Sequence, residues 1–113
     1  MKQPTIINLT PHDVHVLLGP SCAVFSQTGN IARVVQTLEH VTNLNLMEDK
    51  VCIPVHRVKY GAVDGLPEPK DNVVYIVSAI VKNAVPNRKD LLSPGEVVRD
   101  KQGNIIGCNG FFC

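Results

Sequence analysis

Four histidines and four cysteines are the residues of this chain that could carry nucleophilic or metal chemistry. His12 and His15 are three residues apart, and on β structure an odd spacing places two side chains on opposite faces. Cys52 and His56 share a strand face, but four residues along a strand separate their Cα atoms by about 13 Å. Cys108 lies among small residues, with no cation nearby in the sequence to activate its thiol. We therefore predict no catalytic residue, no metal site and no cofactor.

The polar loop Asn87–Asp90 favours binding over catalysis. It contains two cations and one carboxylate, and it lies between a predicted helix and the apolar pair Leu91 and Leu92. A loop that is anchored at both ends by apolar contacts can form the rim of a ligand site. We expect any ligand to be anionic, because guanidinium groups pair well with phosphate and carboxylate.

Three further arginines interrupt predicted strands that are otherwise apolar: Arg33, Arg57 and Arg99. A guanidinium in such a strand has to be paired or has to reach the surface. These side chains could therefore bind an anion together with the polar loop. Alternatively, an internal ion pair, either Arg99–Asp90 or Arg88–Asp100, ties the last hairpin to that loop. The residue types leave both interpretations open.

The elements that have to position these residues are mostly strands. Valine and isoleucine supply 25 of the 113 residues, and β-branched side chains favour pleated sheet over helix. The apolar run Val73–Val77 predicts a strand that is buried on both faces. Ser78 is placed to cap a short helix that runs through Val85 and ends at Pro86. We predict one mainly β domain over residues 1–113, a compact antiparallel sheet or small barrel with one short helix.

The remaining strands are bounded by turns of glycine, proline and asparagine. The first third of the chain predicts a β-meander with a hairpin-type turn at Gln27–Asn30. For Thr37–Met47 we expect a continued strand or an irregular loop in preference to a helix. Pro54 cannot donate to a ladder, so the strand Val51–Tyr60 is expected at an edge or bulged. The last hairpin is expected to join Glu96–Asp100 to 104–107 around a glycine turn.

Charge and hydropathy exclude several classes of protein. A net charge of +1 without a concentrated basic face argues against a nucleic-acid polymer as partner. The sequence shows no apolar core of a signal peptide and no 18-residue apolar run. We therefore expect a cytoplasmic protein that does not bind membranes and that keeps its cysteines reduced.

Four motifs in fixed order resemble a family of short bacterial and bacteriophage proteins. They are NLTPH (8–12), GLP (65–67) before YIVS (75–78), PNRKDLL (86–92), and VRD (98–100) with Gly103 and IIGC (105–108). The resemblance covers nearly the whole chain apart from residues 37–50. The family carries no assigned activity, so the resemblance implies a bacterial or phage setting, in the host cytoplasm if the chain is phage-encoded.

Three functions follow as hypotheses. The first is a phage-type anti-defence protein that sequesters an anionic, nucleotide-like signalling molecule without converting it. The alternatives are a protein-interaction or structural accessory module, and a small hydrolase that acts on a nucleotide-like ligand through His12 or Cys108. Strand edges such as that carrying Pro54 could also pair in a homo-oligomer. The candidate ligand-binding residues are the polar residues of the motifs and the arginines: Asn8, Thr10, His12, Arg33, Arg57, Asn87, Arg88, Asp90, Arg99 and Asp100.

Overall fold

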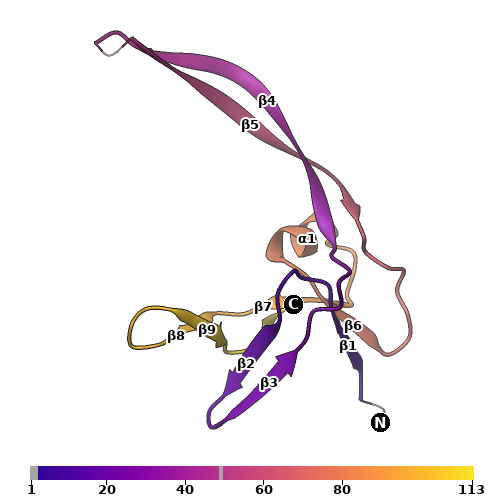
Figure 1. Cartoon of the computed structure of the whole chain (residues 1–113). Helices are drawn as coiled ribbons and strands as arrows, with labels where there is room; N and C mark the ends of the chain where they lie inside the picture. Colours follow the sequence, from indigo (N-terminus) through magenta and orange to yellow (C-terminus); the bar gives the residue numbers. More distant parts are fainter. Residues whose placement is uncertain (1–2, 49) are drawn as a thin grey trace.

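The computed structural model describes residues 3–48 and 50–113. Within these ranges the chain forms ten strands and one short helix (Figure 1). In chain order they are β1 (Thr5–Asn8), β2 (Val14–Leu18), β3 (Ser21–Phe25), β4 (Arg33–Leu46), β5 (Val51–Asp64), β6 (Val73–Ile76), α1 (Ala79–Ala84), β7 (Leu91–Pro94), β8 (Val97–Arg99), β9 (Ile105–Cys108) and β10 (Phe111–Phe112). The predicted mainly β fold with one short helix is confirmed.

Two four-stranded sheets make up the body of the molecule, with the orders β1-β6-β7-β10 and β3-β2-β9-β8. Both sheets are open, so the small barrel that was one expectation does not form. The pairing is also not antiparallel throughout, because β6 runs parallel to both β1 and β7. A strand that is apolar along its whole length needs a neighbour at each edge and cover on both faces, and β1 and β7 supply the neighbours.

The expected meander at the start of the chain is therefore wrong. β1 pairs with β6, while β2 pairs with β3 in an antiparallel hairpin. Gln27–Asn30 is not a hairpin turn either, since it leads from β3 into β4 and these two strands are not neighbours in a sheet. Local turn chemistry predicted the breaks in this region correctly, but it carries no information about which strand a segment will pair with.

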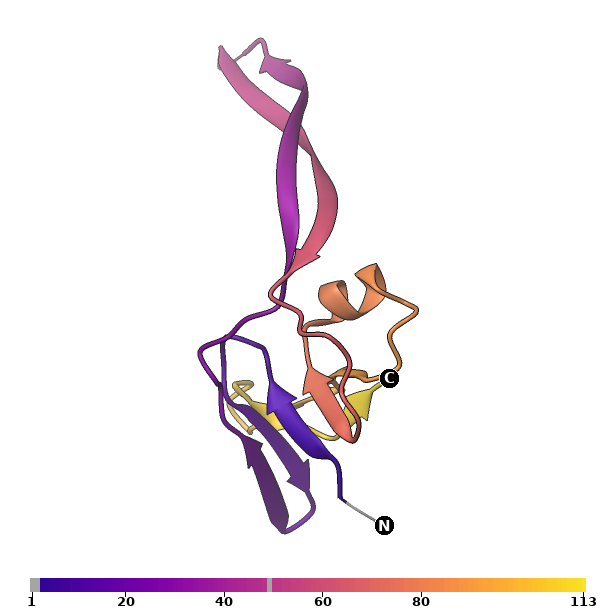
Figure 2. The same cartoon turned by 90° about the vertical axis from the view of Figure 1, so that its right-hand side faces the viewer.

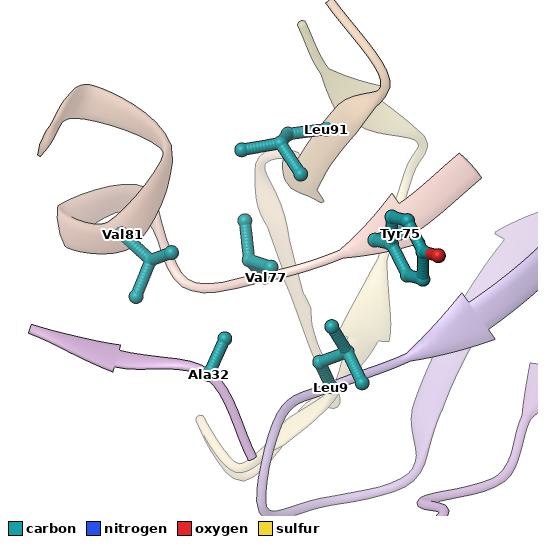
Figure 3. Packing of buried hydrophobic residues seen from close by; sticks show 6 residues of the cluster. All are labelled: Leu9, Ala32, Tyr75, Val77, Val81 and Leu91. Atoms are coloured by element: carbon teal, nitrogen blue, oxygen red, sulfur yellow. The ribbon is translucent and has the colours of Figure 1, made fainter. Parts of the chain in front are cut away.

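Two hydrophobic clusters hold the body together, and β6 contributes to both. Figure 3 shows the first, in which Tyr75, Val77 and Leu91 pack with residues from the first loop, from the segment before the arm and from α1. Ile76 points to the second cluster, where it packs with residues of β2 and β9. Side chains alternate across a strand, so the burial of the neighbours Tyr75 and Ile76, one in each cluster, confirms that β6 is covered on both faces.

Two local predictions about the second half of the chain are confirmed. Ser78 caps α1, because its side-chain oxygen accepts a hydrogen bond from the backbone N–H of Val81 at 3.3 Å. The helix itself is one residue shorter than expected, since Val85 is its C-cap. β8 and β9 form the predicted hairpin, and Gly103 supplies the positive φ of +86° that its turn requires.

The long hairpin of β4 and β5 projects from the body as a twisted two-stranded arm (Figures 1 and 2). We call residues Arg33–Asp64 the arm. Each strand has 14 residues and pairs only with the other, so the region expected as strand or loop is strand, and Pro54 lies in an edge strand as predicted. The radius of gyration is 18.8 Å, against about 13 Å for a compact domain of this length. The molecule is therefore elongated.

Candidate functional site

The first group of predicted ligand residues, Asn8, Thr10 and His12, forms a corner of the backbone. The amide nitrogen of Asn8 donates to the carbonyl oxygens of His12 and Phe25, at 2.8 and 2.9 Å. Its amide oxygen accepts hydrogen bonds from the backbone N–H and the hydroxyl of Thr10. Asn8 and Thr10 are buried with these bonds formed, so their polar atoms are already occupied. The ring of His12 is exposed.

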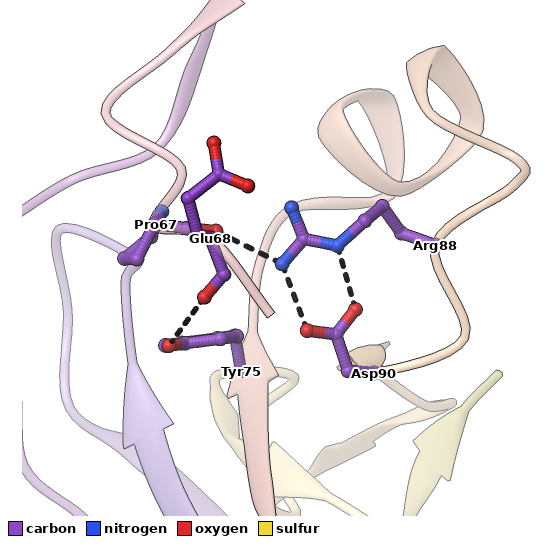
Figure 4. A network of polar contacts seen from close by, with 5 residues as sticks. All are labelled: Pro67, Glu68, Tyr75, Arg88 and Asp90. Atoms are coloured by element: carbon purple, nitrogen blue, oxygen red, sulfur yellow. Dashed lines mark hydrogen bonds and ion pairs between the residues drawn. The ribbon is translucent and has the colours of Figure 1, made fainter. Parts of the chain in front are cut away.

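The second group is the polar loop after α1, and its central feature is an ion pair (Figure 4). Nε and Nη2 of Arg88 donate to the two carboxylate oxygens of Asp90, each at 2.8 Å. Nη2 also donates to the carbonyl oxygen of Pro67 at 3.0 Å, which ties the loop to the segment before β6. The hydrogen bonds from Arg88 hold the pKa of the Asp90 carboxyl below its usual value. Much of the binding capacity of Arg88 is therefore used inside the protein.

Next to this ion pair lies a shallow basic depression of about 460 Å³. It is lined by Lys82, Arg88 and Lys89 together with small, polar and apolar residues of α1, the following loop and the C-terminus. Lys82 also donates to the backbone oxygen of Cys113 at 3.1 Å. Asn87 lies on the other side of the loop, where it lines a separate depression with Asp90.

The third group, Arg99 and Asp100, stabilises the turn of the β8–β9 hairpin. Asp100 accepts hydrogen bonds from the backbone N–H groups of Gln102 and Asn104, both at 2.9 Å. These bonds, that of Asn104 foremost, lower the pKa of its carboxyl. Arg99 donates to the carbonyl oxygen of Gly103. The predicted pairs Arg99–Asp90 and Arg88–Asp100 do not form, because each of these groups finds a partner within its own loop.

The remaining two arginines belong to the arm. Arg33 is its first residue, and Arg57 lies near the middle of β5, 3.9 Å from a carboxylate oxygen of Glu39. The four arginines therefore lie on four separate elements: the start of β4, the middle of β5, the loop after α1 and the end of β8. The structure brings Asn8 and Thr10 together with His12 at one corner, Asn87 and Arg88 with Asp90 in one loop, and Arg99 with Asp100 in one turn. It does not gather the ten residues around one site.

A different candidate surface emerges on the arm. In its outer half, the cross-strand pairs Leu44–Ile53 and Leu46–Val51 share one face. All four side chains are 41–53% exposed, and we call them the tip patch. Met47, in the turn beyond them, is 88% exposed. Alternation of apolar residues is normally typical of a strand with one buried face, yet here that face has no cover among the described residues.

A second apolar patch lies on the opposite face, nearer the body. It consists of the cross-strand pair Leu38–Val58 and of Tyr60, which are 45–67% exposed, and we call it the base patch. Val58 is five residues from Ile53 on a strand without an insertion at that point, so the two side chains lie on opposite faces. The register shifts between the two halves because β4 contains one extra residue, between His40 and Thr42, whereas β5 does not.

The other face of each half is more polar, although Val35, Cys52 and Pro54 also lie there. Behind the tip patch lie Asn43 and Asn45. Behind the base patch, Glu39 pairs with Lys59 at 2.8 Å and is 3.9 Å from Arg57. Between the halves, His40 and His56 meet edge to face, with ring centroids 5.6 Å apart. The arm is thus amphipathic along its whole length, but its apolar face changes sides half-way.

Sequence reasoning missed this surface for a physical reason. The apolar positions of the arm were visible in the sequence, but exposure depends on whether a second sheet covers the strand, and periodicity does not report this. One signal was available. β4 contains neither proline nor glycine, and its only charged residues are Arg33 and Glu39, whereas exposed edge strands usually carry such protection.

Comparison of the chain with protein-family models, with curated proteins and with solved structures finds no match. Within residues 3–48 and 50–113, no three His, Cys, Asp or Glu side chains lie close enough together to hold a metal ion. Cys108 is buried, and its sulfur lies 3.5 Å from the carbonyl oxygen of His15. No helix in the described part of the chain is long and apolar enough to cross a membrane.

Proposed function

We propose that this chain is a non-enzymatic protein-interaction module that uses the arm to bind another protein chain. The observation that carries the proposal is the pair of exposed apolar patches on a hairpin that projects from the body (Figure 2). A two-stranded hairpin is marginally stable by itself in water. Contiguous exposed apolar surface on such an element is typical of an interaction site.

The apolar surface is large enough to support binding. The tip and base patches together contain seven side chains that are about half exposed. Full burial of a valine, leucine or isoleucine side chain contributes about 1.5–3 kcal/mol, so covering the exposed halves contributes on the order of 5–10 kcal/mol. Association costs about 4–15 kcal/mol. Most of both patches must therefore be covered for a complex to form.

A shortened arm tests this proposal. Gln36 and Tyr60 are paired across the arm, so residues 37–59 can be replaced by an Asn-Gly turn, which suits a two-residue hairpin loop. We expect the shortened chain to lose association with its partner chain, measured by light scattering on the purified protein and by co-purification from its native cell. The same number of chains per particle and the same co-purifying proteins for both forms would contradict the proposal.

A smaller change provides a matched pair of variants. Ile53→Asp places a charge in the tip patch, whereas Cys52→Asp places the same charge on the polar face one residue away. Burial of an unpaired carboxylate is unfavourable, so only the Ile53 variant should lose the partner. This comparison separates the loss of an apolar contact from a general effect of added negative charge.

The basic depression favours a second candidate function, which is sequestration of a small anionic, nucleotide-like molecule as the motif resemblance suggests. Lys82, Arg88 and Lys89 all line it, and clustered cations favour phosphate. A thermal-shift panel of cyclic nucleotides and ADP-ribose derivatives tests this candidate. We expect stabilisation that Lys82→Ala and Lys89→Ala together remove. Mass spectrometry of the recovered ligand then distinguishes binding from hydrolysis, and no shift with any compound contradicts the candidate.

A further inference from the structure

We propose that the partner of the arm is the arm of a second copy of this chain, bound antiparallel so that each tip patch meets the other copy's base patch. This inference rests on the proposed function and specifies the partner. The tip patch and the base patch lie at opposite ends and on opposite faces of one ribbon. A two-fold interface requires a surface that is complementary to itself. Contact of each tip patch with the other copy's base patch satisfies that requirement, because the same contact then occurs twice.

The change of face half-way along the arm fits a crossed pair. Two-stranded ribbons twist more strongly than wide sheets, and Figures 1 and 2 show the arm twisting along its length. Two such ribbons that cross antiparallel wind around one another, so each presents one face near its tip and the other face near its base. The polar residues behind each patch, such as Asn43 and the Glu39–Lys59 pair, then stay in water.

The charges of the arm favour a copy of itself over a strongly charged partner. Its sequence has four basic and four acidic residues, and so a net charge of zero: Arg33, Lys50, Arg57 and Lys59 against Glu39, Glu48, Asp49 and Asp64. Two neutral arms do not repel each other, whereas a highly acidic or basic partner would gain no electrostatic attraction.

The base of the arm also offers a place for the other copy's tip. A depression of about 400 Å³ lies where the arm meets the body, lined among others by Pro11, Ile31, Val34 and Ile80. In an antiparallel crossing, the highly exposed Met47 of the second copy lies at this end of the arm. Methionine is flexible and fills irregular apolar gaps, so we assign Met47 to this depression.

The size of the contact sets the expected affinity. A strand of 14 residues is about 46 Å long and a two-stranded ribbon about 10 Å wide, so each copy contributes a footprint of about 450 Å². Stable complexes bury about 800 Å² on each partner. We therefore expect a reversible dimer that forms with rising concentration, and we expect Leu44→Asp to raise its dissociation constant about tenfold or more.

Disulfide trapping tests the geometry with two variants that each carry one exposed cysteine and the buried Cys108. In a full-length background with Cys22→Ser, Cys52→Ser and Cys113→Ser, which removes the exposed thiols, one chain carries Leu38→Cys and the other Leu44→Cys. We expect mild oxidation to link the two chains when they are mixed and to link neither chain with itself. The matching melting temperatures of both variants would show that each is folded.

Two results would overturn the inference. One is efficient linkage of the Leu44→Cys chain with itself, which would place the tips together. The other is a monomeric mass for the unmodified chain from micromolar to millimolar concentration. If the chain is monomeric while the shortened arm still loses a co-purifying protein, the second copy is excluded and the proposed function stands. If the chain is monomeric and the shortened arm also loses no co-purifying protein, both the second-copy inference and the proposed function fail.

Discussion

The guanidinium of Arg88 forms a two-point ion pair with the carboxylate of Asp90, across a single intervening residue. Both hydrogen bonds are 2.8 Å long, and the two side chains are only 19% and 18% exposed. Nη2 of Arg88 also donates to the carbonyl oxygen of Pro67. Two segments of the chain, the loop after α1 and the segment before β6, meet through this pair, so Arg88 stabilises the body whether or not it also binds a ligand.

Asp90→Asn should therefore destabilise the body. The substitution keeps the shape of the side chain but removes its charge and leaves a partly buried guanidinium with one weaker acceptor, which costs about 1–2 kcal/mol. Chemical denaturation of the purified chain measures the difference. Lys89→Ala is the control, because Lys89 is the exposed residue between the two partners. Equal unfolding free energies for Asp90→Asn and the unmodified chain would contradict this prediction.

The same ion pair predicts how the difference in unfolding free energy between the unmodified chain and Asp90→Asn depends on pH. Arg88 lowers the pKa of Asp90 in the folded state, so the ion pair stabilises the fold fully above the unfolded-state pKa of about 3.9. This stabilisation is lost as the pH falls through the folded-state pKa. We expect the gap between the unmodified chain and Asp90→Asn to narrow below about pH 4. A gap that stays constant or widens on acidification would show that charge is not its cause.

The sequence predicted those parts of the fold that depend on local chemistry. Ser78 capping α1, Gly103 in the last turn and the burial of β6 on both faces each follow from residue type and spacing. What failed depends on contacts between distant segments. β1 and β6 pair residues that are 68 positions apart (Thr5 with Val73), and the four arginines span 66 positions, from Arg33 to Arg99. Periodicity does not encode such partners.

In the candidate site, too, the roles that depend on contacts between distant segments could not be predicted from the sequence. Asn8 looked like a ligand residue because it begins a motif, whereas its amide satisfies three backbone groups in the fold. The apolar residues of the arm looked like half of a core, because a sequence does not report the absence of a covering sheet. Buried polar residues and exposed apolar residues are the informative exceptions, and both required the structure.

Asn8→Asp should be among the most damaging substitutions in the body. The amide nitrogen of Asn8 donates to two carbonyl oxygens, at 2.8 and 2.9 Å, and the side chain is 1% exposed. A carboxylate would face both carbonyls without a proton to donate, so we expect a loss of about 3 kcal/mol or more. Thermal unfolding measures it. The control, Asn72→Asp, changes an exposed amide that also donates to a carbonyl, and similar losses for both would contradict the prediction.

Gly65 fixes the point at which the arm returns to the body. Its φ is +80°, and a Cβ at this position would overlap the carbonyl oxygen of Ile31. Gly103 has a similar φ of +86° with open space around it. Gly103→Ala should therefore lose about 1–2 kcal/mol from its left-handed backbone alone, and Gly65→Ala should lose clearly more. Denaturation curves of the two variants measure the difference, and equal losses would exclude the backbone overlap as a cost.

Shortening the arm should leave the stability of the body nearly unchanged. Among the arm residues that the structure describes, only Val34 and Val63 pack against the core cluster that contains Tyr75 and Val77, and replacing residues 37–59 retains both. Those residues pair only with one another, so their removal takes away neither core contacts nor a sheet neighbour of the body. We expect the shortened chain to unfold in one transition near the melting temperature of the full-length monomer. A large fall in that temperature would mean that the arm stabilises the body, and its apolar patches would then need an explanation within one chain.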